Sequence, residues 1–147
     1  MSRIEGFGGE YHFLSNFHPS EVVLDGISYA TVEHAYQAAK TLDTEERSII
    51  RDAKTAAMAK KLGKHVTVTV DWNARKLEVM GDLLWQKFTR HDHLRRKLLD
   101  TGNAELLETN WWGDTYWGVC RGAGTNYLGK LLMSVRKQLR EDERIIA

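Results

Sequence analysis

The stretch Thr31-Val-Glu-His-Ala-Tyr-Gln-Ala-Ala-Lys40 contains three alanines and neither glycine nor proline. This composition predicts a helix, with Thr31 as its N-cap. At 3.6 residues per turn, the alanines fall on one side of the helix, which suits close packing. The opposite side lines up a carboxylate, a phenol, an amide and an amine, from Glu33, Tyr36, Gln37 and Lys40.

The polar side of this helix has two interpretations. An acidic residue in a first turn and a basic residue in a last turn are favoured by the helix dipole, so Glu33 and Lys40 would be ordinary surface charges. Alternatively, both side chains point into a cavity and form part of a site. The helix by itself favours the first interpretation, and the rest of the chain supports the second.

Composition sets limits on the class of protein. The 147 residues are 42% apolar and 28% charged, with a net charge of +1. This indicates one globular domain over residues 1–147, without broad electrostatic binding to nucleic acid. We expect no signal peptide and no membrane span, and Cys120 is the single cysteine. A cytoplasmic protein without a disulfide is therefore expected.

Local patterns predict a mainly α (α+β) fold with a small antiparallel β-hairpin. The hairpin is expected over residues 21–29, because Asp25-Gly26 is a typical two-residue turn. The other expected elements are a short extended piece around Tyr11 and Phe13, helices over 44–52 and 55–62 (the second ending at a C′ Gly63), a strand over 65–70, a long helix after Asp71, a helix from His91 to Thr101, an extended segment over 104–112 and a final helix over 127–141.

Lysines are concentrated in and around the expected helix over residues 55–62. Lys54, Lys60, Lys61 and Lys64 form a basic patch without an intervening acid. The usual interpretation of such a patch is a solvated face, and the less usual one is a rim that attracts phosphate.

Two loops offer candidate binding residues. Gly122-Ala-Gly124 precedes a helix with Thr125 or Asn126 as N-cap, which is either a weak phosphate loop or a tight turn with a cap. Asp114, just before Trp117, either caps a turn or serves as a second carboxylate. In the other loop, Asn16 and Phe17 present an amide and a ring; an Asx turn with Phe17 in the core is the alternative.

The candidate residues of this chain suit the binding of a nucleotide or a ribosyl phosphate. We find no Ser-His-Asp signature, and His91-Asp92-His93 does not place two ligands on one helix face, so a metal site is not expected. Aromatic rings would stack a base, amides would bind phosphate and carboxylates would bind the sugar. No cofactor, membrane or stable protein partner is expected.

Four blocks of the chain together resemble the YbiA-like (NADAR) family. They are residues 9–19, residues 31–40, Val79-Met-Gly-Asp-Leu-Leu-Trp-Gln-Lys-Phe88 and residues 113–136. The resemblance implies a compact, mostly helical fold and N-glycosidic bond chemistry. It points to Asn16, Glu33, Lys40, Trp72, Asp114, Trp117, Gly124 and Asn126 as site residues. The stretch Gly118-Val-Cys-Arg121 departs from the glycine-richer sequence of some relatives.

The resemblance and the chemistry together predict a catalytic set of Glu33, Lys40 and Asp114. Glu33 would stabilise positive charge at the anomeric carbon, and Lys40 would attack that carbon to form a Schiff base. Asp114 would hold ribose hydroxyls or move protons. The expected substrate-binding residues are Asn16, Phe17, Tyr36, Trp72, Trp117, Gly122, Gly124 and Asn126.

Three functions remain open at this point. The first is hydrolysis of ribosylamino-pyrimidine phosphates, which are intermediates of riboflavin synthesis. The second is removal of ADP-ribose from guanine bases, including bases in nucleic acid. The third is non-catalytic binding of ADP-ribose or a related nucleotide.

Overall fold

The computed structural model describes residues 2–146, and the contacts within the chain gather in two units. The central unit is Asn16–Arg90. The terminal unit combines the described residues up to Ser15 with those from His91 onward. The expectation of one domain over the whole chain remains a prediction.

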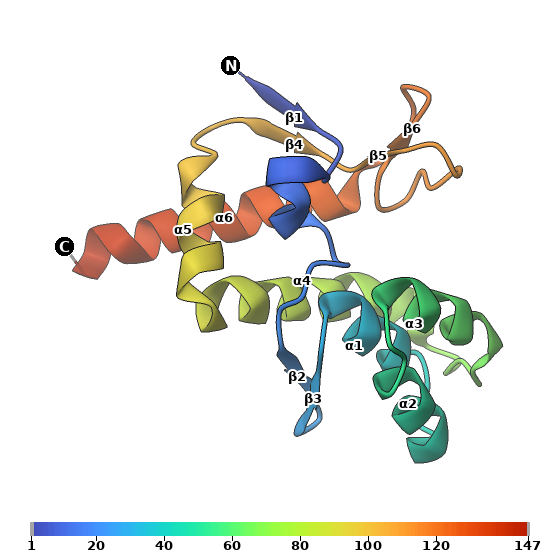
Figure 1. Cartoon of the computed structure of the whole chain (residues 1–147). Helices are drawn as coiled ribbons and strands as arrows, with labels where there is room; N and C mark the ends of the chain where they lie inside the picture. Colours follow the sequence, from blue (N-terminus) through green and yellow to red (C-terminus); the bar gives the residue numbers. More distant parts are fainter. Residues whose placement is uncertain (1, 147) are drawn as a thin grey trace. The chain divides into compact units, whose positions relative to one another are not determined.

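The central unit is built around α1 (Figure 1). Its elements are β2 (Val22–Leu24), β3 (Ile27–Tyr29), α1 (Val32–Ala39), α2 (Thr44–Arg51), α3 (Ala56–Leu62), the 3-10 turn η2 (Gly63–His65) and α4 (Trp72–Arg90). Helix α1 packs against α2, α3 and α4, and β2 pairs antiparallel with β3. Asp25 and Gly26 both have positive φ, at 50° and 82°, as a type I′ turn requires, so the predicted hairpin is confirmed.

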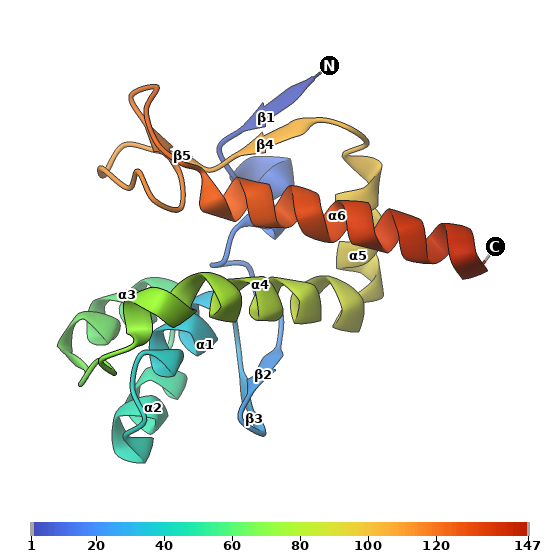
Figure 2. The same ribbon diagram turned by 180° about the vertical axis from the view of Figure 1, so that it is seen from behind.

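The terminal unit combines helices with short parallel strand pairs. Its elements are β1 (Arg3–Glu5), the 3-10 helix η1 (Gly9–Leu14), α5 (Asp92–Asp100), β4 (Glu105–Leu107), β5 (Thr109–Asn110), β6 (Val119–Cys120) and α6 (Tyr127–Ile146). β1 pairs with β4 and β5 with β6, both in parallel. Helix α6 contacts both β4 and α5, and Figure 2 shows it running along the strand pair.

The mainly helical fold with a small hairpin is confirmed, but two extended segments were wrongly predicted. Tyr11 and Phe13 lie in η1, where the Tyr11 amide donates to the Gly8 carbonyl at 3.0 Å. The segment 65–70 forms no strand, because no neighbouring strand pairs with it. Instead, the Thr69 amide donates to the Lys40 carbonyl at the end of α1, at 2.9 Å.

No helix within residues 2–146 is both long and apolar enough to cross a membrane.

Lys87 is an unusual member of the α4 core. Its side chain is fully buried, with Nζ 5.2 Å from the centroid of the Phe88 ring. Burial lowers the pKa of Lys87 from its ordinary 10.5 to about 7. Between these two pKa values, Lys87 is largely neutral in the folded chain and protonated in the unfolded chain.

Lys87→Met should change the pH dependence of stability. Between about pH 7 and pH 10 the unfolded state binds more protons than the folded state, so the free energy of unfolding rises with pH. Urea unfolding at pH 7 and pH 9 should show a gain of about 2 kcal/mol in the wild type relative to Lys87→Met, in which this slope is absent. Parallel pH profiles for the two proteins would contradict this account.

Candidate active site

Hydrogen bonds within the central unit fix the start of α1. The Thr31 hydroxyl accepts from the His34 amide at 3.0 Å, which confirms Thr31 as N-cap. The His34 ring lies between two partners, since its Nδ1 is 2.7 Å from the Thr31 hydroxyl and its Nε2 donates to the Ala53 carbonyl at 2.9 Å. All eight residues of α1 are buried, so the interpretation of Glu33 as a surface charge is wrong.

Glu33 lies in a polar contact inside the core. Its Oε2 accepts from Gln37 Nε2 at 2.6 Å, one turn further along α1, and its residue is 7% exposed. Burial raises the pKa of Glu33, and the Gln37 hydrogen bond together with the charges of Lys60 and Lys40 partly offsets this rise. The buried carboxyl group therefore keeps its proton to a higher pH than an exposed glutamate does.

Gly63 leaves room for the Gln37 side chain. Helix α3 ends before Gly63 as predicted, but Gly63 is the C-cap and not a C′ residue, because it has φ −61° and continues into η2. A Cβ at this position would overlap Gln37 Oε1. The glycine is needed for close packing of α3 against α1, and through Gln37 it supports the position of Glu33.

Gly63→Ala should therefore disturb both stability and the site. The free energy of unfolding should fall by about 1–3 kcal/mol, as for other overpacked positions, and the Gln37–Glu33 contact should shift. Gly8→Ala is the matched control, because nothing lies within 4 Å of a Cβ there. Equal stabilities of the two variants in urea unfolding would rule out this role of Gly63.

Asn16 contacts Glu33 through a backbone hydrogen bond. Its carbonyl accepts from the Glu33 amide at 3.1 Å, and its Nδ2 donates to Met80 Sδ at 3.5 Å. Its Oδ1 is buried and has no hydrogen-bond partner among the described residues, so the Asx turn does not form. Phe17, next in the chain, is half-buried and lies only partly in the core.

The Tyr36 ring lies against both Trp72 and Lys40. The rings of Tyr36 and Trp72 have centroids 5.2 Å apart, and Lys40 Nζ is 5.8 Å from the Tyr36 centroid. Trp72 is buried, so much of its ring is already covered. Lys40 is half-buried, and burial lowers the pKa of its amine, while the charge of Glu33 acts in the opposite direction.

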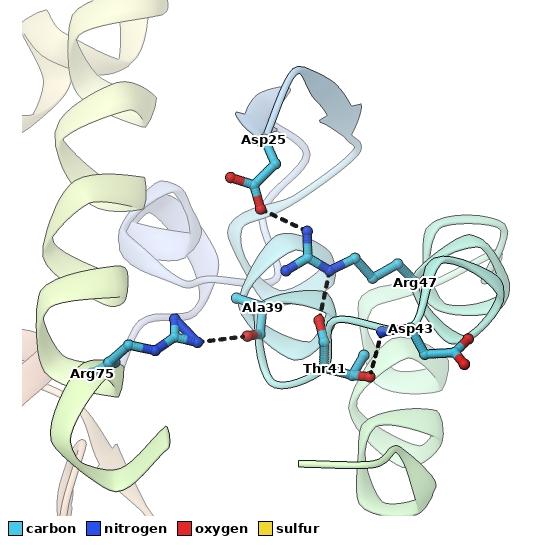
Figure 3. A network of polar contacts seen from close by, with 6 residues as sticks. All are labelled: Asp25, Ala39, Thr41, Asp43, Arg47 and Arg75. Atoms are coloured by element: carbon cyan, nitrogen blue, oxygen red, sulfur yellow. Dashed lines mark hydrogen bonds and ion pairs between the residues drawn. The ribbon is translucent and has the colours of Figure 1, made fainter. Parts of the chain in front are cut away.

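Side chains from α2 and α4 anchor the backbone around Lys40 (Figure 3). Arg75 Nη2 donates to the Ala39 carbonyl at 3.5 Å, and Arg47 Nε donates to the Thr41 carbonyl at 2.7 Å. The backbone on both sides of Lys40 is therefore held in place.

In the terminal unit, Asp114 organises a turn. Its Oδ1 accepts from the amides of Tyr116 and Trp117, at 3.0 and 2.9 Å, as expected of a capping aspartate. Asn110 holds the same turn, since its Nδ2 donates to the Asp114 carbonyl at 2.8 Å. Trp117 is half-buried, with its ring edge-on to Tyr116 at 4.7 Å.

Backbone amides at the start of α6 already donate hydrogen bonds to carbonyls of the same chain. The Tyr127 and Leu128 amides donate to the carbonyls of Tyr116 and Trp117, both at 3.0 Å. The Asn126 side chain takes no part in capping, because it bridges the β4 segment, donating to the Leu106 carbonyl and accepting from the Glu108 amide. Amides expected to bind phosphate thus have partners already.

The glycines of this loop have structural explanations. Gly124 has φ 148°, and a Cβ there would overlap the Gly118 carbonyl. Gly122 has φ 79° in open space, as in a left-handed turn. The tight-turn interpretation therefore accounts for both positions.

The predicted site residues fall into two groups. The central unit holds Asn16, Phe17, Glu33, Tyr36, Lys40 and Trp72, and the terminal unit holds Asp114, Trp117, Gly122, Gly124 and Asn126. Sequence reasoning missed the anchoring by His34 and the packing role of Gly63. His34 had a local signal, three residues after the N-cap, whereas nothing in the sequence pairs Gly63 with Gln37.

Comparison with known families settles the membership of the chain. The NADAR domain family matches residues 6–140. The chain belongs to the NADAR family. In solution, the NMR structure of Escherichia coli YbiA has the same fold, with a TM-score of 0.86 and 34% identity, over 97% of this chain and 87% of that one.

Curated NADAR relatives carry enzyme names. "N-glycosidase Npun_R5314" of Nostoc punctiforme is 39% identical over 136 residues, 88% of this chain and 86% of that protein. "N-glycosidase YbiA" of Escherichia coli K12 is 38% identical, over 88% of this chain and 82% of that protein. "Riboflavin biosynthesis protein VVA0006" of Vibrio vulnificus is 36% identical over 88% of this chain, but only 36% of that longer protein is covered. The prediction of an N-glycosidase is confirmed at this general level.

Proposed function

We propose that this NADAR protein hydrolyses the C–N bond between a ribose phosphate and a base-like amine, with ribosylamino-pyrimidine phosphates as substrates. The observation that carries the proposal is the α1 pair, Glu33 on the helix and Lys40 at its C-cap: a buried acid with a raised pKa and a half-buried amine with a lowered pKa. The riboflavin-related name of the Vibrio vulnificus relative supports this substrate class.

Glu33 supplies the acid. A protonated carboxyl group gives its proton to the ring oxygen of the ribosylamine, and the ring opens to an iminium ion at the former anomeric carbon. The resulting carboxylate then stabilises the positive charge that forms on this carbon.

Lys40 supplies the nucleophile. Its neutral amine adds to the iminium carbon, the pyrimidine amine leaves with a proton, and a Schiff base to Lys40 remains. Water hydrolyses this imine, releasing the open-chain sugar phosphate and restoring the amine. A lowered pKa keeps more of the amine neutral near pH 7.

Other side chains bind the substrate in this proposal. Asn16 Oδ1 accepts a hydrogen bond from a ribose hydroxyl, which gives this buried oxygen the partner that it lacks. Tyr36 lines the sugar beside Lys40. Phe17, in the same unit, offers a ring face to the base. Binding of a substrate by Asp114 and Trp117 of the terminal unit remains a prediction from the sequence.

A paired assay tests the proposal. The protein is incubated with a ribosylamino-pyrimidine phosphate and, separately, with ADP-ribosylated guanosine, and the released base and sugar are quantified by chromatography. Faster release from the pyrimidine substrate supports the proposal. Cleavage of only the guanosine adduct would establish the ADP-ribosyl hydrolase instead, and ADP-ribose binding without any cleavage would establish a binding module.

A further inference from the structure

The lysine-rich segment between α2 and α4 is not used by the chemistry described above. Residues 54–64 carry four lysines and no acidic residue. Lys60 lies on the last turn of α3, and Lys64 lies in η2, on either side of the Gly63 that packs against Gln37. This end of the segment is therefore placed beside the polar side of α1.

A third lysine reaches the same region from α4. Lys76 is four residues after Trp72, so both lie on one side of α4, and the Trp72 ring packs on Tyr36 of α1. The charges of Lys76, Lys60 and Lys64 all act on Lys40 and lower the pKa of its amine. Lys60 also acts on Glu33.

Several positive charges gather around Lys40. Lys76, Lys60 and Lys64 act on its amine in one direction, and the buried acid Glu33 acts in the opposite direction. Asp71, the acid directly before α4, is in an ion pair with Arg75 at 3.2 Å. A cluster of like charges beside a cleavage site is stabilised when a dianionic ligand occupies it.

We propose that Lys60, Lys64 and Lys76 form a binding site for the terminal 5′-phosphate of the ribosyl substrate, next to Glu33 and Lys40. The inference rests on the proposed function for the identity of the sugar. It places the phosphate in the central unit, whereas the amides at the start of α6 donate to carbonyls of their own loop. A terminal phosphate suits lysines because each ammonium group acts as a mobile point charge.

Charge-matched variants of the same segment test the site. Lys60→Gln/Lys64→Gln removes two charges near α1, and Lys54→Gln/Lys61→Gln removes two exposed charges from the same segment. Turnover is measured with the 5′-phosphorylated ribosylamine and its dephosphorylated form. Binding of ribose 5-phosphate, ribose and ADP-ribose is measured by calorimetry.

The first variant should raise KM for the phosphorylated substrate about tenfold or more, with a smaller effect on kcat. KM for the dephosphorylated form should change less than about twofold, and the control variant should behave as wild type. Lys76→Gln should act in the same direction as the first variant. Ribose 5-phosphate binding should weaken in parallel with KM.

Equal losses with phosphorylated and dephosphorylated substrates, or equal effects of the two double variants, would overturn the phosphate site. Lysine dependence for ADP-ribose but not for ribose 5-phosphate would also overturn it, because an inner phosphate would then be the ligand. Lysine-dependent binding of ribose 5-phosphate without cleavage of any substrate would uphold the phosphate site while the proposed glycosidase fails.

Discussion

Lys40→Ala should reduce turnover of the ribosylamine roughly a thousandfold or more, as expected when a covalent nucleophile is removed. The fold should survive, because the Lys40 carbonyl keeps its bond from the Thr69 amide. Borohydride added during turnover should reduce the Schiff base in the wild type and leave the sugar phosphate attached to the protein. Mass spectrometry of peptides should place this adduct on Lys40.

Two further variants separate the nucleophile from its charge. Lys40→Arg keeps the positive charge but has no amine able to form an imine, so it should be as inactive as Lys40→Ala. Lys137→Ala removes an exposed lysine from α6 and should leave turnover and trapping unchanged. An adduct of unchanged yield in Lys40→Ala would assign the imine to another amine.

Local signals were sufficient for the parts of the fold that depend on neighbouring residues. The N-cap at Thr31 and the Asp25-Gly26 turn were both predictable because a side chain or a backbone conformation within four residues decides them. The 3-10 helix at Tyr11 and the loss of a strand at residues 65–70 were not. In both segments, contacts with distant parts of the chain override the local pattern, since the 3-10 helix contacts α5 and the Thr69 amide donates to the Lys40 carbonyl.

In the candidate site, too, local signals predict one part and tertiary contacts decide the other. Helical periodicity places Glu33 and Lys40 on one side of α1, but it does not say whether that side is buried. Burial depends on the approach of α3 at Gly63 and on the Trp72 ring from α4, which are tertiary contacts. The phosphate loop expected at residues 122–126 stays a prediction. Its pattern did not reveal that the carbonyls of Tyr116 and Trp117 accept from the amides at the start of α6.

Glu33→Gln should lower kcat about 10²- to 10⁴-fold with little change in stability. Glutamine has nearly the shape of glutamate and can still accept a hydrogen bond from Gln37 Nε2, which is 2.6 Å from Glu33 in the wild type. It cannot supply a proton to the ring oxygen or carry the negative charge that stabilises the iminium carbon. Glu45→Gln, an exposed carboxylate on α2, should have no effect.

The pH profile of Glu33→Gln gives a sharper test than the rate alone. Wild-type activity should fall at high pH as Glu33 loses its proton, so the variant should lack this alkaline limb. The charge of Glu33 also raises the pKa of Lys40, so removing this charge should lower that pKa. The pH below which borohydride trapping declines, because Lys40 is protonated, should then be lower in the variant. If both limbs stayed where they are in the wild type, Glu33 would not be the acid, and it would not be electrostatically coupled to Lys40 during the reaction.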